Sequence, residues 1–249
     1  MQYRDLTIQS LGREQLVIAC DTSAAIGHKA NDTLDVDPKL TSAMCVRVPL
    51  LELLSIGAEP FVIVNLFGNE MKPTGEQLLK GIRSELVKAG YPDLEMNGST
   101  EENMETTTTS LGVTLIGKAL EDDLLWKRVK PRDVVYQIGY PYVGSDLIEH
   151  REEIVSYDDV RWIQSMGELV SEIVPVGSKG SWNEAEQVAK MNELSFTPSD
   201  DLELESLCTQ SAGPSTTILV VGKVELLQSL NERFKHVFVI GEMGGKAHG

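Results

Sequence analysis

The sequence has few of the residues that common covalent and metal chemistries use. Its 249 residues include three cysteines and four histidines, and none of them has the spacing of a zinc site. A GxSxG nucleophile elbow, an HExxH pair and a GxGxxG turn after a strand are also missing. These absences argue against a zinc enzyme, a serine hydrolase and a dinucleotide oxidoreductase. Three cysteines far apart in the chain are typical of reduced thiols in a cytoplasmic protein.

Long apolar runs and an excess of basic charge are missing as well. The longest apolar stretches, such as residues 61–66, are far shorter than the roughly 20 residues of a membrane helix, and the polar N-terminus does not resemble a signal peptide. The formal net charge of −16 argues against an electrostatic grip on nucleic acid. We therefore expect no membrane and no nucleic-acid partner, although carboxylates that hold a divalent metal can still bind an anionic nucleotide.

Hydrophobic periodicity predicts strands that alternate with helices in two halves of the chain. The sequence therefore predicts a mixed α+β fold with an N-terminal domain over residues 1–125 and a C-terminal α/β domain over 126–249. An acidic loop is expected at "FTPSDDLELES". The predicted strands are 15–20, 61–67, 94–96, 111–118, 134–138, 215–222 and 236–241, and the predicted helices are 39–57, 74–89, 145–149, 157–167, 181–191 and 223–233.

Two acids stand where a carboxylate needs an explanation. Asp21 follows the apolar strand 15–20 and precedes Thr22 and Ser23, so it either holds Mg²⁺ beside a phosphate or makes an ordinary Asx turn. Glu52 is flanked by leucines in the helix "VRVPLLELLSIGAEP". A buried carboxylate there must be paired or bind a metal, whereas the alternative is a solvent-facing glutamate near Arg47 or Lys39.

Two glycine-containing segments have the composition of phosphate sites. "NGSTEEN" follows a short predicted strand and offers backbone N–H groups at Gly98, Ser99 and Thr100 beside the carboxylates of Glu101 and Glu102. "PVGSKGSWNEAEQ" places Lys179 before a predicted helix whose Ser181 and Glu184 have capping-box spacing. A flexible loop and a well-capped helix are the simpler interpretations of these segments.

Taken in order, the segments "ACDTSAAIG", "ELLSIGAEP", "NGSTEEN…LGVTLIGK" and "RDVVYQIGYPYVG" resemble the ATP-binding superfamily of aminoimidazole ribonucleotide synthetase, thiamine-monophosphate kinase and selenophosphate synthetase. The resemblance covers most of the chain and is strongest over residues 15–119. Within the superfamily, the Asp-x-Ser-x-x-Ile-Gly opening, "GSTE", "PVGSKG" and "SAGP" are most similar to α-ribazole kinases.

The resemblance implies a kinase that transfers the γ-phosphoryl group of ATP to the 5′-hydroxyl of α-ribazole, with Mg²⁺ as cofactor. Asp21 matches the metal-binding aspartate of the family, and Glu52 falls on the aspartate of a helix motif. Ser99 replaces the aspartate of a Gly-Gly-Asp-Thr loop, so either Glu101 or Glu102 supplies that ligand or one metal site is altered. Thr22, Ser23, Gly98, Ser99 and Thr100 are then expected at the nucleotide.

Lys179 falls near an aspartate that helps bind the acceptor in thiamine-monophosphate kinases, which implies a different acceptor and a role in catalysis or acceptor binding. The resemblance further implies a homodimer formed through the N-terminal domain. The alternatives are another acceptor such as thiamine monophosphate, an ATP-binding regulator without catalysis, and a scaffold that binds no nucleotide.

Overall fold

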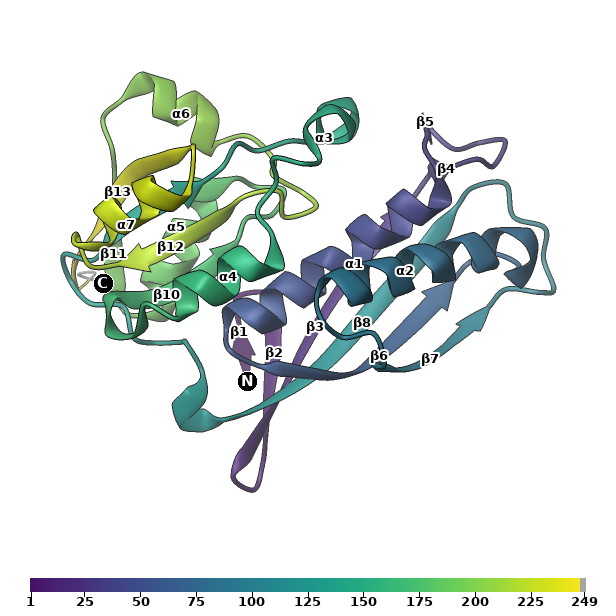
Figure 1. Ribbon diagram of the computed structural model, residues 1–249, viewed down its shortest axis with the longest axis horizontal. Helices are drawn as coiled ribbons and strands as arrows, with labels where there is room; N and C mark the ends of the chain where they lie inside the picture. The colour runs from purple at the N-terminus through teal and green to yellow at the C-terminus, as the bar shows by residue number, and fades with distance from the viewer. Residues whose placement is uncertain (247–249) are drawn as a thin grey trace. The chain divides into compact units, whose positions relative to one another are not determined.

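The computed structural model describes residues 1–246, which fold into two compact units (Figure 1). The first unit holds Met1–Leu54 and Ala58–Asp122, and the second holds Ser55–Gly57 and the described residues from Asp123 onward. The domain boundary predicted after residue 125 lies close to this division. Ser55–Gly57 belong to the second unit, where the Leu125 backbone N–H donates to the Ile56 carbonyl at 2.8 Å.

The first unit is built on a six-stranded sheet. Its strand order is β1 (Gln2–Tyr3), β2 (Leu6–Leu11), β3 (Glu14–Ala24), β8 (Ser110–Leu120), β6 (Glu59–Phe67) and β7 (Glu95–Thr100). All neighbours are antiparallel except β6 and β7, which are parallel. The short strands β4 (Ile26–Gly27) and β5 (Leu34–Asp35) form a separate parallel pair.

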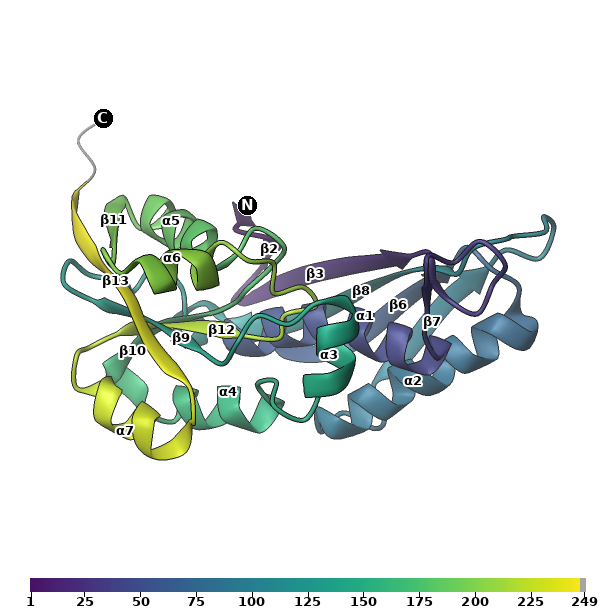
Figure 2. The same cartoon turned by 90° about the horizontal axis from the view of Figure 1, so that it is seen from above.

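Two helices cover one face of this sheet (Figure 2). They are α1 (Pro38–Ser55) and α2 (Glu76–Lys88), the second preceded by the π-helical turn Met71–Gly75. The helices approach each other closely at Gly81, where a Cβ atom would lie 2.0 Å from the Lys39 carbonyl oxygen. Ser42 Oγ donates to the Leu78 carbonyl at 2.8 Å across the same contact, so glycine and serine set the spacing of the helix pair.

The second unit has an antiparallel five-stranded sheet between two pairs of helices (Figure 2). Helices α5 and α6 lie on one face, and α4 and α7 lie on the other. Residues such as Val135, Val188 and Leu219 form the core on the α5 side. The strand order is β10 (Val170–Pro175), β12 (Ile218–Gly222), β9 (Val134–Ile138), β13 (Val237–Lys246) and β11 (Leu194–Pro198), and the helices are α3 (Gly144–His150), α4 (Tyr157–Gln164), α5 (Ser181–Met191), α6 (Leu202–Cys208) and α7 (Leu226–Arg233), with 3₁₀ turns at Glu121–Asp123 and Gly167–Leu169.

The predicted mixed α+β fold is confirmed, and β9 and α5 match their predicted ranges residue for residue. Within residues 1–246, no helix combines the length and apolar character needed to cross a membrane. β1, β2 and β10 were not predicted. β1 has only two residues, and β2 and β10 both mix polar residues with their apolar ones.

Four local predictions were wrong. The strand predicted over 15–20 continues to Ala24 because β8 pairs with it as far as Ser110, so Asp21 lies within a strand and makes no turn. The strand predicted over 94–96 likewise continues through Thr100 beside β6. The predicted acidic loop overlaps the end of β11 and the start of α6, whose first turn is capped by Asp201. The N-cap of α5 is Gly180, with no side-chain capping bond, so the predicted capping box does not form.

Candidate functional site

Three strands of the first unit end at one edge of its sheet. β3 and β6 are both antiparallel to β8, and β7 is parallel to β6, so β3, β6 and β7 all run in the same direction. Their carboxyl ends lead into residues 25–37, 68–75 and 101–109. Polar residues from segments far apart in sequence therefore meet at this edge, which we call the loop edge.

Asp21 lies on β3 near the loop edge, on the same face as the buried residues Val17 and Ala19. Its carboxylate accepts a hydrogen bond from Cys45 of α1. Burial raises the pKa of Asp21, and the hydrogen bonds from the Thr22 backbone and from Cys45 only partly offset that effect. No lysine or arginine of the described residues contributes to this environment, so the carboxylate is suited to bind a cation.

The two residues after Asp21 point away from each other, because side chains alternate along a strand. Thr22 is exposed and its hydroxyl donates to the Leu111 carbonyl at 3.0 Å. Ser23 lies half-buried on the same face as Asp21. Only Ser23 therefore shares the face of the carboxylate.

Glu52 is buried and forms an ion pair with Arg4, whose Nη2 lies 2.7 Å from Glu52 Oε2. The side chains are 5% exposed for Arg4 and 8% for Glu52, so the predicted burial is confirmed and the solvent-facing alternative is wrong. Glu52 also lies two helical turns beyond Cys45, about 10 Å along the axis at ~1.5 Å per residue. Its carboxylate is already neutralised by Arg4. It therefore does not belong to the part of α1 around Cys45 that contacts Asp21.

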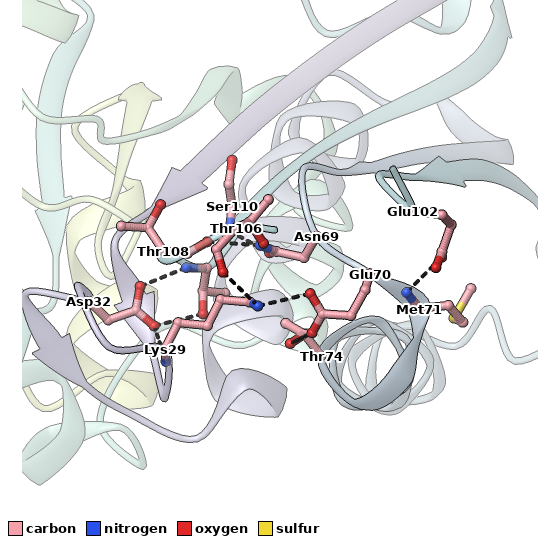
Figure 3. Close-up of polar contacts among 11 residues, drawn as sticks. Lys29, Asp32, Asn69, Glu70, Met71, Thr74, Glu102, Thr106, Thr108 and Ser110 are labelled. Atoms are coloured by element: carbon pink, nitrogen blue, oxygen red, sulfur yellow. Dashed lines mark hydrogen bonds and ion pairs between the residues drawn. The ribbon is translucent and has the colours of Figure 1, made fainter. Parts of the chain in front are cut away.

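Glu101 and Glu102 are both tied into the turn that follows β7. Glu101 Oε1 accepts from the backbone N–H groups of Asn103 at 2.7 Å and Met104 at 3.2 Å, which hold the pKa of this exposed carboxyl below its usual value. Glu102 Oε1 accepts from the Met71 backbone N–H at 2.8 Å (Figure 3). It also accepts from Thr100 Oγ1 at 2.7 Å. Across residues 1–246, no three histidine, cysteine, aspartate or glutamate side chains form a group arranged for a metal. The four predicted metal ligands are thus not gathered into one preformed site.

A network around Lys29 joins the segments of the loop edge (Figure 3). Lys29 Nζ donates to Glu70 Oε2 at 2.8 Å and to the Thr106 carbonyl at 3.0 Å. Partial burial alone would raise the pKa of Glu70, but the hydrogen bonds from Lys29 and Thr74 lower it to about 2. The Lys29 ammonium is therefore engaged with a carboxylate.

Asp32 holds the same segments from the other side (Figure 3). Its carboxylate accepts from the Lys29 backbone N–H at 2.8 Å and from the backbone N–H and hydroxyl of Thr109, both at 2.7 Å. Burial opposes ionisation, yet these bonds give Asp32 a lowered pKa. Gly27 permits this arrangement, because a Cβ atom there would lie 2.1 Å from Thr109 Oγ1.

Asn69 completes the network. Its amide donates to Thr106 Oγ1 and to the Thr108 carbonyl, each at 2.8 Å, and accepts from the Ser110 backbone N–H at 2.8 Å (Figure 3). Asp32, Asn69 and Glu70 were not predicted as site residues. The signal that could have found the last two is their position directly after the strand "FVIVNLF".

An open pocket of about 290 Å³ lies between α2 and β7, the edge strand of the sheet. It includes the three residues predicted at the nucleotide in "NGST", namely Gly98, Ser99 and Thr100. These residues lie on a strand and not in the flexible loop that was predicted. Arg83 of α2 is the cation of this pocket, and no carboxylate lines it.

In the second unit, three glycine-containing segments singled out in the sequence meet at one edge of the sheet. The Ala212 backbone N–H donates to the Gly177 carbonyl at 3.1 Å, and the Tyr142 N–H donates to Thr216 Oγ1 at 3.0 Å. Lys179 is exposed in the turn before α5. The structure thus joins "GYPYVG", "PVGSKG" and "SAGPSTT" within one unit.

No protein-family model matches this sequence, and no curated protein matches it. Solved structures match over almost the whole chain. Thiamine-monophosphate kinase from Stenotrophomonas maltophilia has a TM-score of 0.64 at 16% identity, with 98% of this chain and 90% of that chain covered. The Aquifex aeolicus thiamine monophosphate kinase has a TM-score of 0.64 at 14% identity, covering 99% and 90%.

T. maritima PurL, solved in complex with ADP, has a TM-score of 0.69 at 15% identity; the match covers 99% of this chain and 42% of PurL. These similarities show the fold of the chain, which is the mixed α+β fold of the thiamine-monophosphate kinases. More particularly, the chain matches almost the full length of those kinases and less than half of PurL.

Proposed function

We propose that the protein is an ATP-dependent kinase that phosphorylates the 5′-hydroxyl of α-ribazole. The observation that carries the proposal is the loop edge, where an unpaired, half-buried Asp21 lies on a strand whose end meets the ends of β6 and β7. Solved examples of the same fold include PurL with ADP and AaThiL with AMPPCP and TMP. Nucleotide binding by this fold supports the proposal.

The donors at the loop edge suit Mg²⁺, which prefers hard carboxylate oxygens and usually shares them with nucleotide phosphates. Asp21 is the strongest candidate because burial raises its pKa and no cation pairs with it, and a bound cation would reverse that shift. Glu101 or Glu102 would add a second carboxylate from the turn that follows β7. Glu52 fits less well, because Arg4 already neutralises it.

The proposed reaction forms a bond between the acceptor 5′-oxygen and the γ-phosphorus and breaks the bond from that phosphorus to the β–γ bridging oxygen. The products are the acceptor phosphate and ADP, and the proton of the 5′-hydroxyl is released to water. Bound Mg²⁺ would neutralise charge on the phosphate oxygens. Because phosphoryl transfer depends mainly on in-line positioning and charge neutralisation, the proposal assigns no side chain as general base. Thr22, Ser23 and the backbone of 98–100 are proposed nucleotide contacts, and Lys179 is a proposed acceptor contact.

ADP release from MgATP tests this proposal with purified protein and three conditions: α-ribazole, thiamine monophosphate and no acceptor. We expect release only with α-ribazole, and its loss in Asp21→Ala. Release with thiamine monophosphate alone would transfer the assignment to the second acceptor, with which a thiamine-monophosphate kinase fold is also compatible. Nucleotide binding without release for any acceptor would contradict catalysis and favour a regulator, for which Ser99 in place of the family aspartate is the specific observation.

We also propose a homodimer formed through the sheet face of the first unit that α1 and α2 leave uncovered. Ile18, Ile116 and Val62 form one cross-strand row on this face. Leu66 lies on the same face and is 55% exposed. An apolar sheet face of this kind is typical of a protein interface. Sedimentation equilibrium should give a dimer for the wild type and a monomer for Val62→Lys, and a monomeric wild type would contradict the proposal.

A further inference from the structure

The pocket between α2 and β7 differs chemically from the rest of this acidic protein. Arg83 contributes its only charged side chain, although the chain as a whole carries a formal net charge of −16. Among the described residues, Arg83 forms no ion pair or hydrogen bond, so its exposed guanidinium is available to a ligand. Guanidinium groups stack on flat aromatic rings as well as binding anions.

The walls of the pocket are apolar and adaptable. Met71, Leu79 and Met96 line it from the turn before α2, from α2 and from β7. Methionine side chains fill irregular gaps and make favourable contacts with aromatic rings. A volume of about 290 Å³ is near the lower limit of ~300 Å³ for small-molecule pockets, which suits one ring system better than a whole nucleotide.

Asn65 supplies a polar group on the floor of the pocket that can bind the edge of such a ring. Asn65 Nδ2 is held by the Asn97 carbonyl at 3.0 Å, and Asn97 Oδ1 accepts from the Gly98 N–H at 2.8 Å. Asn97 and Ser99 pair with Val64 and Leu66, so their side chains point to the uncovered face, whereas Asn65 lies on the same face as Met96. Asn65 Oδ1 accepts no hydrogen bond from the described residues and is therefore free to accept one from a ligand in the pocket. A nucleobase presents donors and acceptors along its edge, whereas an aliphatic ligand does not.

The direction of the elements also orients a ligand. β7 runs from Met96 toward Thr100 and the loop edge, and α2 starts from the Met71 turn at that same edge. The Met71 and Thr100 end therefore lies beside Glu102, whereas Arg83 lies two turns into the helix. A ligand with its ring near Arg83 and its phosphates near Thr100 would bring those phosphates toward the carboxylates of the loop edge.

We infer that the pocket between α2 and β7 binds the base of a purine-type nucleotide, with Leu79 and Met96 packing on the ring and Arg83 stacking over it. This inference rests on the proposed nucleotide-dependent function and adds the part of the first unit that recognises the base. Arg83 and Leu79 lie one turn apart on α2, so one helix face supplies both contacts.

The test measures equilibrium dissociation constants of the full chain for MgATP and for magnesium tripolyphosphate, which has no base. Leu79→Trp fills the pocket, and we expect it to weaken MgATP at least about tenfold while leaving tripolyphosphate unchanged. Arg83→Gln should weaken MgATP binding about twofold to fivefold, because a stacked cation contributes ~0.5–1 kcal/mol at exposed sites. Lys80→Gln removes the same charge from the same helix, outside the pocket, and should bind like the wild type.

Wild-type affinity for MgATP in both Leu79→Trp and Arg83→Gln would overturn the base pocket and leave the kinase proposal intact. Equal loss of ATP and tripolyphosphate in the variants would also overturn it, since the change would then not concern the base. A wild type that binds no MgATP would contradict the kinase proposal and the pocket together. Where Leu79→Trp lowers the unfolding midpoint, the Arg83→Gln and Lys80→Gln pair decides the question.

Discussion

Paired and unpaired acids of the first unit differ in what they do for the molecule. Glu70 and Asp32 are held by hydrogen bonds from Lys29, Thr74 and Thr109, and both have lowered pKa values. Asp21 lies near the same edge of the sheet, yet its pKa is raised by burial with no cation beside it. The difference separates acids that hold the loops together from an acid that is available to a ligand.

Substitution of Glu52 should have the largest effect on stability, because its ion pair is more deeply buried than those of Glu70 and Glu76. Glu52→Gln removes the carboxylate from this buried ion pair, and breaking a buried pair costs about 3–5 kcal/mol. The double variant Arg4→Met/Glu52→Leu should recover much of this loss. Urea unfolding of the wild type, Glu52→Gln and the double variant measures these changes in stability. Equal stability of Glu52→Gln and the wild type would show that the pair contributes little.

Asp21 should give the opposite pattern, with a large effect on activity and a small one on stability. Asp21→Asn should reduce acceptor-dependent ADP release by about a hundredfold or more, equivalent to at least ~2.7 kcal/mol. Its unfolding midpoint should stay the same or rise, because burial disfavours the charged carboxylate that the variant removes. Calorimetry beside steady-state kinetics checks both, and a strongly destabilised variant would place Asp21 among the structural acids.

Glu70 should show its role through pH. Its pKa falls from the usual 4.5 to about 2 on folding, so its contribution is present above pH 4.5 and is lost as pH falls toward 2. Because the side chain is partly exposed, we expect about 1 kcal/mol from the Lys29 pair after solvent screening. Glu70→Gln should therefore unfold more easily at pH 7 and lose less stability on acidification. Parallel acid dependence of variant and wild type would remove Glu70 from the network.

Lys72 and Glu76 supply the smallest effect and the control for the others. Their ion pair is 3.7 Å long, with side chains 80% and 45% exposed, so Lys72→Gln should change the free energy of unfolding by less than about 0.5 kcal/mol. The same urea titration measures it. A loss of unfolding free energy as large as that of Glu70→Gln would mean that burial does not determine how much these ion pairs contribute to stability.

Elements with strong local patterns could be predicted from sequence. The apolar run of β9 and the amphipathic α5 were placed correctly, because their periodicity is contained within each segment. Strand ends were not, because pairing partners set them: Asp21 remains in β3 because Val113 of β8 lies opposite it. The sequence therefore singled out Asp21 but placed it after the strand and not within it.

The candidate site was only partly predictable for the same reason. Lys29 meets Glu70 across 41 positions of sequence, and Asp32 meets Thr109 across 77, so no local pattern indicates either contact. The burial of Glu52 was recognisable from its leucine neighbours, but its partner Arg4 was not, since it is 48 positions away. The metal roles of Asp21, Glu52, Glu101 and Glu102 stay predictions.

Transfer of a radiolabelled γ-phosphate from ATP to α-ribazole tests the central claim most directly, because it follows the group that the proposed reaction moves. Wild-type protein should produce labelled α-ribazole phosphate in the presence of Mg²⁺, whereas Asp21→Asn should produce almost none and Lys72→Gln should match the wild type. Label that stays in ATP, or appears only as free phosphate with all three proteins, would contradict a kinase acting on this acceptor.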